Sequence, residues 1–390
     1  METKEEDNKW YMYRNNNGEW ISEDHVVIVS RIEVGVLKTL AAKQCKPLSV
    51  QRGPDDLLWC YKHEIEAINK EYKTEPIYRK LRIKKIMSMD SKSMKKKIKE
   101  FTEECRAKQG AFRMGMGEPE GVGPFSSSTT PHTNMLTNGE ITGKNFVNQF
   151  AFEYAKERVA NKQKNETIQE FRLFNNMLSS QPMAFNLFCP FIQMLKEGKT
   201  ELATEIFQKI FPEMCIMKVT EVGLEFLHTD IENYLNDKTA MDAIVRYIDT
   251  DGLQSFIAIE TKYTDVLNTG TGSKRARYNE WIKKLGEFKP ETEEALLNGS
   301  KIVTQIYRNF LLAESYGISD KANRYYSVVL SPAHHPTTEE EVASLRNELK
   351  PEYQYKVSSI SLEYFIECAL SVCPEEEQEP FVYFSNRYCK

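Results

Sequence analysis

The 390-residue sequence predicts an α/β protein of the α+β type, in which helices flank a mixed central sheet. Helical patterns in the C-terminal two thirds are followed by three strand-like segments, a further helical stretch and another strand. Two of these strands are joined by a strong turn signal, which indicates a hairpin. Hydrophobic residues form 41% of the chain, enough to bury a large core in one domain or two.

The chain divides into three predicted parts. Residues 1–70 form a small N-terminal accessory module or extension, with a strand at 25–29, a helix near 36–43 and no recognisable chemistry. Residues 71–140 form a basic helical region that ends in a glycine-rich loop. Residues 141–390 form the larger α/β domain.

Positive charge is concentrated between positions 79 and 108, although the net charge of the whole chain is -5. Apolar residues repeat there at helical spacing, at Met94, Ile98, Phe101 and Cys105. The lysines therefore lie on the outer face of an amphipathic helix. Such a face is often only solvated, and contact with nucleic-acid phosphates is the alternative. The candidates for that contact are Lys95, Lys96 and Lys99.

The third part begins with helical patterns at 146–159, 166–188 and 201–211, followed by a strand at 215–227. Further helices are expected at 277–285 and 302–314, and a later strand at 325–330 precedes Pro332. The pair His334 and His335 lies in a proline-flanked stretch that we interpret as a surface loop.

The hairpin lies between Thr239 and Tyr263, with strands at 240–248 and 253–262. If residues 250–252 form the loop and Gly252 takes the left-handed conformation, Asp249 faces Leu253. The same register places Asp242 opposite Glu260. Side chains alternate along a strand, so Lys262 shares the face of Glu260.

Two carboxylates about 5 Å apart repel by roughly 3 kcal/mol at an effective dielectric constant of about 20. The pair Asp242 and Glu260 therefore needs a cation, which is either Lys262 or a divalent metal ion. A solvated ladder of surface salt bridges is the alternative. The segment 256–259 is apolar on both faces, which favours a buried strand over that ladder.

These residues resemble the PD-(D/E)XK nuclease superfamily, with Asp242 as its first acidic residue and Glu260-Thr261-Lys262 as its (D/E)xK element. Other segments resemble a family of bacterial restriction-type endonucleases within that superfamily. They are GKNF at 143–146, RLFNNMLSSQPMAFNLF at 172–188, TAMD at 239–242, QIYRNFLLA at 305–313 and NRY at 386–388. The similarity runs in order from about Lys99 to the C-terminus.

The resemblance implies a restriction-endonuclease-like core, with residues 141–390 as the catalytic domain. It implies a nuclease that uses Mg²⁺, with Mn²⁺ as a substitute, and that acts on DNA in restriction or anti-phage defence. RNA stays open as a substrate, and a homodimer is expected by analogy. Asp242, Glu260 and the Thr261 carbonyl would bind the metal ion, and Lys262 would position water or stabilise the phosphate. We expect a depressed pKa for Lys262, from burial near a metal ion.

Other residues have two interpretations each. Glu225 is a further candidate metal ligand or an exposed strand-end glutamate. Gln181 and Asn186 either support the site or cap and pack their helix. Arg308 either meets a phosphate or pairs with a buried acid. A second basic cluster, beyond a flexible loop, is a candidate DNA contact: Lys274, Arg275 and Arg277.

The eight cysteines lack paired CxxC spacing, which is typical of a reducing compartment. Cys45, Cys60 and His63 could ligate zinc, but no fourth ligand is evident, so buried thiols are expected. No apolar run approaches membrane-spanning length, so we expect a soluble cytoplasmic protein. A non-catalytic nucleic-acid-binding protein and a partner-binding protein that uses the basic helix are the alternative functions.

Overall fold

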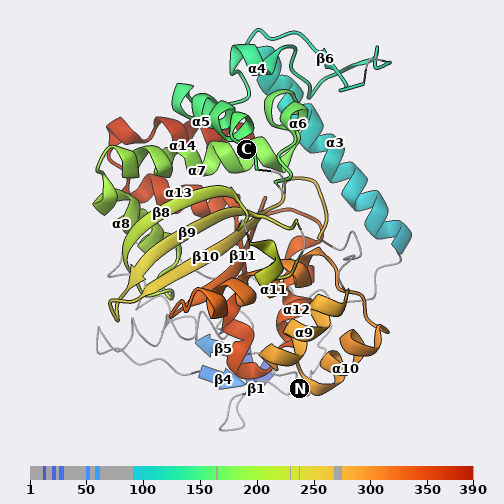
Figure 1. Ribbon diagram of the computed structural model, residues 1–390, viewed down its shortest axis with the longest axis vertical. Coiled ribbons are helices and arrows are strands. Elements are labelled where there is room, and N and C mark those ends of the chain that lie inside the picture. Colours follow the sequence, from blue (N-terminus) through green and yellow to red (C-terminus); the bar gives the residue numbers. More distant parts are fainter. Residues whose placement is uncertain are drawn as a thin grey trace. The chain divides into compact units, whose positions relative to one another are not determined.

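The computed structural model describes residues 12–14, 20–22, 26–29, 50–52, 58–61 and 91–389, the last range without 126, 164–165, 229, 237 and 268–274 (Figure 1). The chain divides into two compact units, Met1–Met89 and Asp90–Lys390. The three-part division at 70/71 and 140/141 stays a prediction. No helix in the described residues is long and apolar enough to cross a membrane.

The first unit contains short antiparallel strands. A two-stranded sheet pairs β1 with β2, and a three-stranded sheet has the order β3-β5-β4. The bounds are β1 Met12–Arg14, β2 Trp20–Ser22, β3 Val26–Val29, β4 Val50–Arg52 and β5 Leu58–Tyr61. The strand predicted at 25–29 is therefore confirmed by β3. Cys60 is buried, whereas the helix predicted near 36–43, Cys45 and His63 lie outside the described residues.

The second unit is built on a five-stranded sheet with the order β12-β11-β10-β9-β8. In this sheet, β8, β9 and β10 pair antiparallel, whereas β10, β11 and β12 pair parallel. The sheet is therefore mixed, as predicted. The bounds are β8 Ile216–Phe226, β9 Met241–Asp249, β10 Gln254–Thr261, β11 Tyr325–Ser331 and β12 Val357–Ser361.

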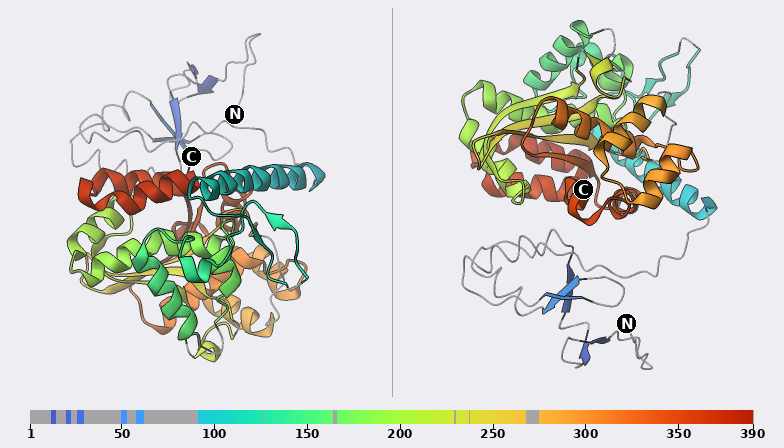
Figure 2. Two further views of the ribbon diagram at one scale, coloured as in Figure 1. Left: turned by 90° about the horizontal axis from the view of Figure 1, so that it is seen from above. Right: turned by 60° about the horizontal axis from the view of Figure 1, so that its bottom comes forward.

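Helices cover both faces of this sheet (Figures 1 and 2). One hydrophobic cluster joins the sheet to α5 Gln149–Ala160, α6 Glu170–Asn175, α7 Ser180–Lys196, α8 Thr200–Ile210, α13 Leu362–Val372 and α14 Glu379–Phe384. The other joins it to α9 Arg275–Leu285, α10 Pro290–Asn298, α11 Gln305–Ser319 and α12 Thr338–Glu348. Ile257 and Ile259 belong to the first cluster, and Phe256 and Ala258 to the second. Strand β10 is apolar on both sides because both sides are covered.

The predicted helix at 166–188 is wrong in one respect, because it is broken into α6 and α7. Ser179 begins α7, since its hydroxyl accepts a hydrogen bond from the N–H of Gln181. Pro182 lies in the first turn of α7, where a proline removes no hydrogen bond within the helix. The side chain of Asn148 caps α5 in the same way, so this helix begins at Gln149, three residues later than predicted.

The basic region contains helix α3, Ser91–Gly115. Cys105 is buried, and Lys95, Lys96 and Lys99 are exposed, as the amphipathic pattern predicts. After α3, a short hairpin pairs β6 Gly121–Val122 with β7 Pro131–His132, and α4 Gly139–Thr142 follows.

The predicted hairpin between β9 and β10 has the expected register. Gln254 pairs with Ile248, and this pairing continues to Ile259 and Ala243. Gly252 has a φ of 78°, the left-handed conformation that the turn requires. The N–H of Asp249 donates to the carbonyl of Leu253 at 2.9 Å.

Candidate active site

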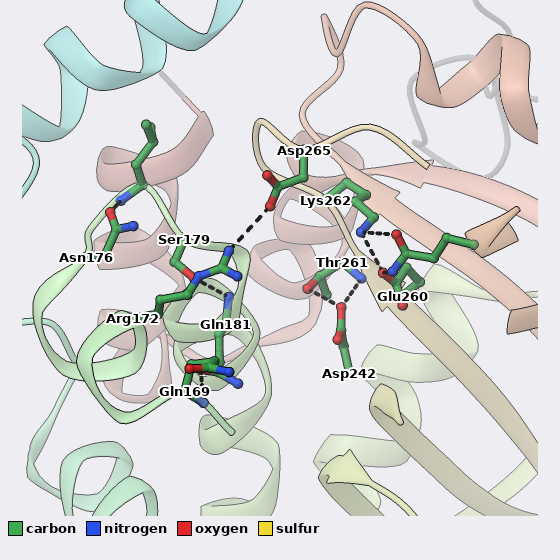
Figure 3. Close-up of polar contacts among 12 residues, drawn as sticks. Gln169, Arg172, Asn176, Ser179, Gln181, Asp242, Glu260, Thr261, Lys262 and Asp265 are labelled. Carbon is green, nitrogen blue, oxygen red and sulfur yellow. Dashed lines mark hydrogen bonds and ion pairs between the residues drawn. The ribbon is translucent and has the colours of Figure 1, made fainter. Parts of the chain in front are cut away.

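Three carboxylates lie side by side on three neighbouring strands. The β9–β10 register, continued by one residue, places Asp242 opposite Glu260. The β8–β9 pairs on either side of Glu225 place it opposite Asp242. The sheet therefore lines up the acidic groups of β8, β9 and β10 at one end of the hairpin, and Figure 3 shows two of them, Asp242 and Glu260.

An open pocket of about 600 Å³ brings these residues together with side chains from several helices. Asp242, Glu260 and Lys262 all line it. The other lining residues are Ile98, Thr167, Gln169, Arg172, Ser180, Gln181, Glu225, Thr264, Asp265, Val266 and Gln305.

Asp242 is held in place by its neighbour across the strands. Its Oδ2 atom accepts hydrogen bonds from the N–H of Thr261 at 2.7 Å and from the Thr261 hydroxyl at 2.9 Å. Burial raises the pKa of Asp242 well above its usual range, and the charges of Glu260 and Glu225 raise it further. The site thus disfavours ionisation of Asp242 unless a bound cation offsets the burial and the neighbouring carboxylates.

Lys262, Glu260 and Gln305 form a buried triangle of contacts. Lys262 Nζ lies 2.8 Å from Glu260 Oε1 and donates to Gln305 Oε1 at 3.1 Å. The Gln305 amide donates to Glu260 Oε1 at 2.8 Å. Gln305 is the first residue of α11, so this helix positions the ion pair.

A depressed pKa for Lys262 is expected beside a bound metal ion and stays a prediction, whereas the protein groups alone shift this pKa the other way. Burial by itself lowers the pKa of Lys262, but the charges of Glu260 and Asp242 outweigh it and raise the pKa above its ordinary value. These protein groups by themselves therefore keep Lys262 a cation at neutral pH.

Glu225 is buried, with 6% of its surface exposed, so it is not an exposed strand-end residue. Its Oε1 atom accepts a hydrogen bond from the Gln181 amide at 2.7 Å. Its φ is +47°, an uncommon conformation for a residue with a side chain, and Arg158 donates to its carbonyl at 3.2 Å. Burial raises the pKa of Glu225, and the charge of Glu260 adds to this effect.

A metal ion would meet oxygen ligands of the right chemical type. Asp242, Glu260 and Glu225 each engage one carboxylate oxygen with donors of the described residues. Among the described residues, the second oxygen of each carboxylate is not a buried atom without a partner, and all three residues line the pocket. These oxygens are therefore open to the pocket. Within the described part of the chain, no three His, Cys, Asp or Glu side chains form a ready-made metal cage.

The supporting candidates fall into two groups. Gln181 lines the pocket and binds Glu225. Asn186 lies in the core and binds the N–H of Val147, the carbonyl of Asn145 and the Tyr388 hydroxyl, so its contacts are structural. Arg308 does not line the pocket, and its buried Nε has no partner in the described residues.

The basic candidates for DNA contact differ in their surroundings. Lys95, Lys96 and Lys99 are exposed on α3, whose Ile98 lines the pocket. Arg277 binds the carbonyls of Tyr234 and Glu232 and the carboxylate of Glu280. Lys274 and the side chain of Arg275 lie outside the described residues.

The surface-loop interpretation holds for His334, which is exposed in a turn, but it is wrong for His335, which is buried. Its Nε2 lies 3.1 Å from the carbonyl oxygen of Asp265, and its ring packs edge-on against Phe101 of α3 at 5.4 Å. Burial lowers the pKa of His335 to about 4, so the ring is neutral at pH 7. His335 therefore supports the loop that follows Lys262.

Sequence reasoning missed Gln305, Arg172 and Asp265 as pocket residues. Gln305 and Arg172 each begin a segment with family resemblance, QIYRNFLLA and RLFNNMLSSQ. The polar residue at the start of each segment was the available signal. Asp265 carried no signal beyond its closeness to Lys262 in the chain.

Comparison with known proteins finds one family. A profile described as the PD-(D/E)XK nuclease superfamily matches residues 96–390, which confirms the resemblance and the restriction-endonuclease-like fold class. No curated protein and no solved structure matches the chain.

Proposed function

Because the chain belongs to the PD-(D/E)XK nuclease superfamily, we propose that it is a metal-dependent nuclease that hydrolyses phosphodiester bonds in DNA. One observation carries this proposal. Asp242, Glu260 and Lys262, the residues that match the family motif, line one pocket that is open to solvent. Nucleic acid is the substrate class of the superfamily, and DNA is our choice within it.

In this proposal Asp242 and Glu260 hold Mg²⁺, or Mn²⁺ in its place, together with the Thr261 carbonyl. Glu225 supplies a further carboxylate at the next strand. When bound, the ion polarises the phosphate and makes water more acidic. Thr261 keeps Asp242 oriented through the two hydrogen bonds to Oδ2.

The chain itself supplies a fixed positive charge at the reaction centre. Hydrolysis builds negative charge on the phosphate oxygens, and a protonated Lys262 stabilises it. Gln305 holds the ammonium group beside Glu260, so little reorganisation is needed during the reaction. Burial of Lys262 lowers the local dielectric constant, which strengthens this interaction.

Lys95, Lys96 and Lys99 are proposed to contact the DNA backbone, because α3 borders the pocket through Ile98. Lys274 and Arg275 stay in the proposal as a second contact. Arg277 is the weaker member of that cluster, since its guanidinium already binds three protein groups. A role in defence and a homodimeric state rest on the resemblance alone.

The test incubates plasmid and single-stranded DNA with the wild type and with Lys262→Ala, with Mg²⁺ or with a chelator. We expect the wild type to cleave DNA only with the metal ion. Loss of a preorganised charge at the reaction centre typically costs about 10²–10³ in rate, so Lys262→Ala should show at least that loss.

The matched control is Lys218→Ala, which removes an exposed lysine near the opposite end of β8 from Glu225. It should cleave like the wild type. Cleavage that survives both Lys262→Ala and the chelator would contradict the mechanism. DNA binding by a wild type that never cleaves would favour the non-catalytic alternative.

A further inference from the structure

The pocket contains two basic side chains that differ in how they are used. Lys262 has 5% of its surface exposed and is bound to Glu260 and Gln305. Arg172 has a side chain that is 50% exposed. A nucleic acid presents several phosphates, and only one of them is at the reaction centre. Arg172 is therefore placed to meet another phosphate.

The backbone of Arg172 is anchored to the core, whereas its side chain is half exposed. Arg172 belongs to α6, and the next two residues, Leu173 and Phe174, are buried in the core. Asn175 ties the end of this helix to the N–H of Gly139 at 2.7 Å. A phosphate contact made by Arg172 would therefore be held at a defined position relative to the pocket.

The partner of Arg172 in the structure is a weak one. Arg172 Nη2 lies 3.7 Å from Asp265 Oδ2, beyond hydrogen-bond distance, and the Asp265 side chain is 53% exposed (Figure 3). Exposed ion pairs contribute about 0–1 kcal/mol. A phosphate offers a guanidinium two parallel charge-assisted hydrogen bonds, so exchange of Asp265 for phosphate is favourable.

We propose that Arg172 binds a backbone phosphate that flanks the one being hydrolysed, and that Asp265 holds the guanidinium until the substrate displaces it. This inference rests on the proposed nuclease function and adds a substrate-binding residue to it. Asp265 itself is kept in position by the contact of its carbonyl with His335.

Loss of Arg172 and loss of the Asp265 charge are expected to change DNA affinity in opposite directions. The pocket is lined by four acids and two bases, so the approach of a polyanion is opposed by charge. Loss of Arg172 removes an attraction, whereas loss of the Asp265 charge removes a competitor and a repulsion. A purely structural ion pair would instead give two changes of the same sign.

The experiment measures binding of a short fluorescein-labelled DNA oligonucleotide by anisotropy, in chelator and over a series of salt concentrations. Arg172→Ala should weaken binding about tenfold, and Asp265→Asn should tighten it several-fold. The slope of log K against log salt should fall by about 0.7–0.9 in Arg172→Ala, which corresponds to one lost phosphate contact.

Further variants separate charge, geometry and folding. Arg172→Lys should recover part of the affinity, because it keeps the charge without the planar fork. In the double variant Arg172→Ala with Asp265→Asn, the tightening should be smaller than in the wild-type background. Lys218→Ala should bind like the wild type. Thermal unfolding of each variant verifies that the fold is intact.

In cleavage assays, Arg172→Ala should raise KM by a larger factor than it lowers kcat. The wild type could cleave DNA while Arg172→Ala leaves KM, affinity and the salt slope unchanged. That result would overturn this inference and leave the nuclease proposal standing. Weaker binding in both Arg172→Ala and Asp265→Asn would also overturn it. A wild type that neither binds nor cleaves DNA overturns both proposals together.

Discussion

At the scale of single residues, Gln305 holds the Lys262 ammonium group beside Glu260 in the pocket. It donates to Glu260 and accepts from Lys262, so one amide satisfies both members of a buried ion pair. Without the amide, the ion pair loses one hydrogen-bond donor and one acceptor that are held in a fixed geometry. In the proposed nuclease, Gln305 would thus act through its neighbours as a positioning residue.

Replacement of Gln305 should therefore impair cleavage more than DNA binding. For Gln305→Ala we expect kcat to fall about 10- to 100-fold, which corresponds to about 1–3 kcal/mol for unsatisfied buried groups. Steady-state kinetics and anisotropy on the same oligonucleotide measure the two effects.

The control is Gln208→Ala, which removes an amide that binds the carbonyl of Ile216 outside the pocket lining. It should leave kcat near the wild-type value. An equal loss of kcat in both variants, or a loss of affinity as large as the loss of kcat in Gln305→Ala, would contradict a positioning role.

The sequence predicts the pairing of Asp242 with Glu260 because a hairpin register is local information. The turn residues fix it, and Gly252 alone identifies the left-handed position. Gln305 is 45 positions from Glu260, and the contact depends on where α11 packs. No local rule encodes such a distance, so Gln305 could not be placed from periodicity.

At the scale of elements, the turn between β9 and β10 carries its own network. Asp249 is fully buried and accepts hydrogen bonds from the Ser255 hydroxyl, the Asn323 amide and two backbone N–H groups. Arg324 Nη1 lies 2.6 Å from Asp249 Oδ2. The network joins the hairpin to the start of β11 and thereby holds the sheet that carries the site.

Asp249→Asn should destabilise the fold by about 2–4 kcal/mol at pH 7, because Arg324 loses its buried partner. Burial alone would raise the pKa of Asp249, but the hydrogen bonds outweigh it and place the pKa below its ordinary value. The folded state therefore resists protonation. The contribution of Asp249 to stability is present above about pH 4 and is lost as the pH falls below it. Urea unfolding as a function of pH measures this.

The matched control is Asp251→Asn, because Asp251 pairs with the same Arg324 at 2.7 Å but is 55% exposed. It should cost less than about 1 kcal/mol. The difference between the wild type and Asp249→Asn should shrink as the pH falls below about 4. A constant difference from pH 7 to pH 3 would show that the charge of Asp249 is not what stabilises the turn.

Whole elements were predictable where apolar periodicity was strong, as in α8 and β11. The break between α6 and α7 could not be predicted in this way, because the helical pattern of the sequence continues through Ser179. Only the hydrogen bond that the Ser179 side chain accepts marks the start of a new helix. Strand β12 was also missed. Its five residues, VSSIS, are mostly polar, and only the pairing with β11 makes them a strand.

At the scale of the whole molecule, α3 links the distribution of charge to the site. Gln109 of α3 donates to the hydroxyl of Tyr263, the residue after Lys262, and to the carbonyl of Arg387 near the C-terminus. Within the second unit, the helix is therefore tied both to the loop after Lys262 and to the segment near Arg387. Its lysines lie on a rigid element, although the chain as a whole is acidic.

Local charge on α3, and not net charge, should control DNA binding. The triple variant Lys95→Glu, Lys96→Glu and Lys99→Glu should bind DNA far more weakly, and its salt slope should fall by about two to three, at roughly 0.9 per lost phosphate contact. The control triple reverses Lys144, Lys218 and Lys283, exposed lysines outside α3 and the pocket lining, and gives the same net charge. It should bind nearly as the wild type does. If both triples weakened binding equally, long-range repulsion by the acidic chain would explain the effect, and α3 would lose its assignment as the DNA contact.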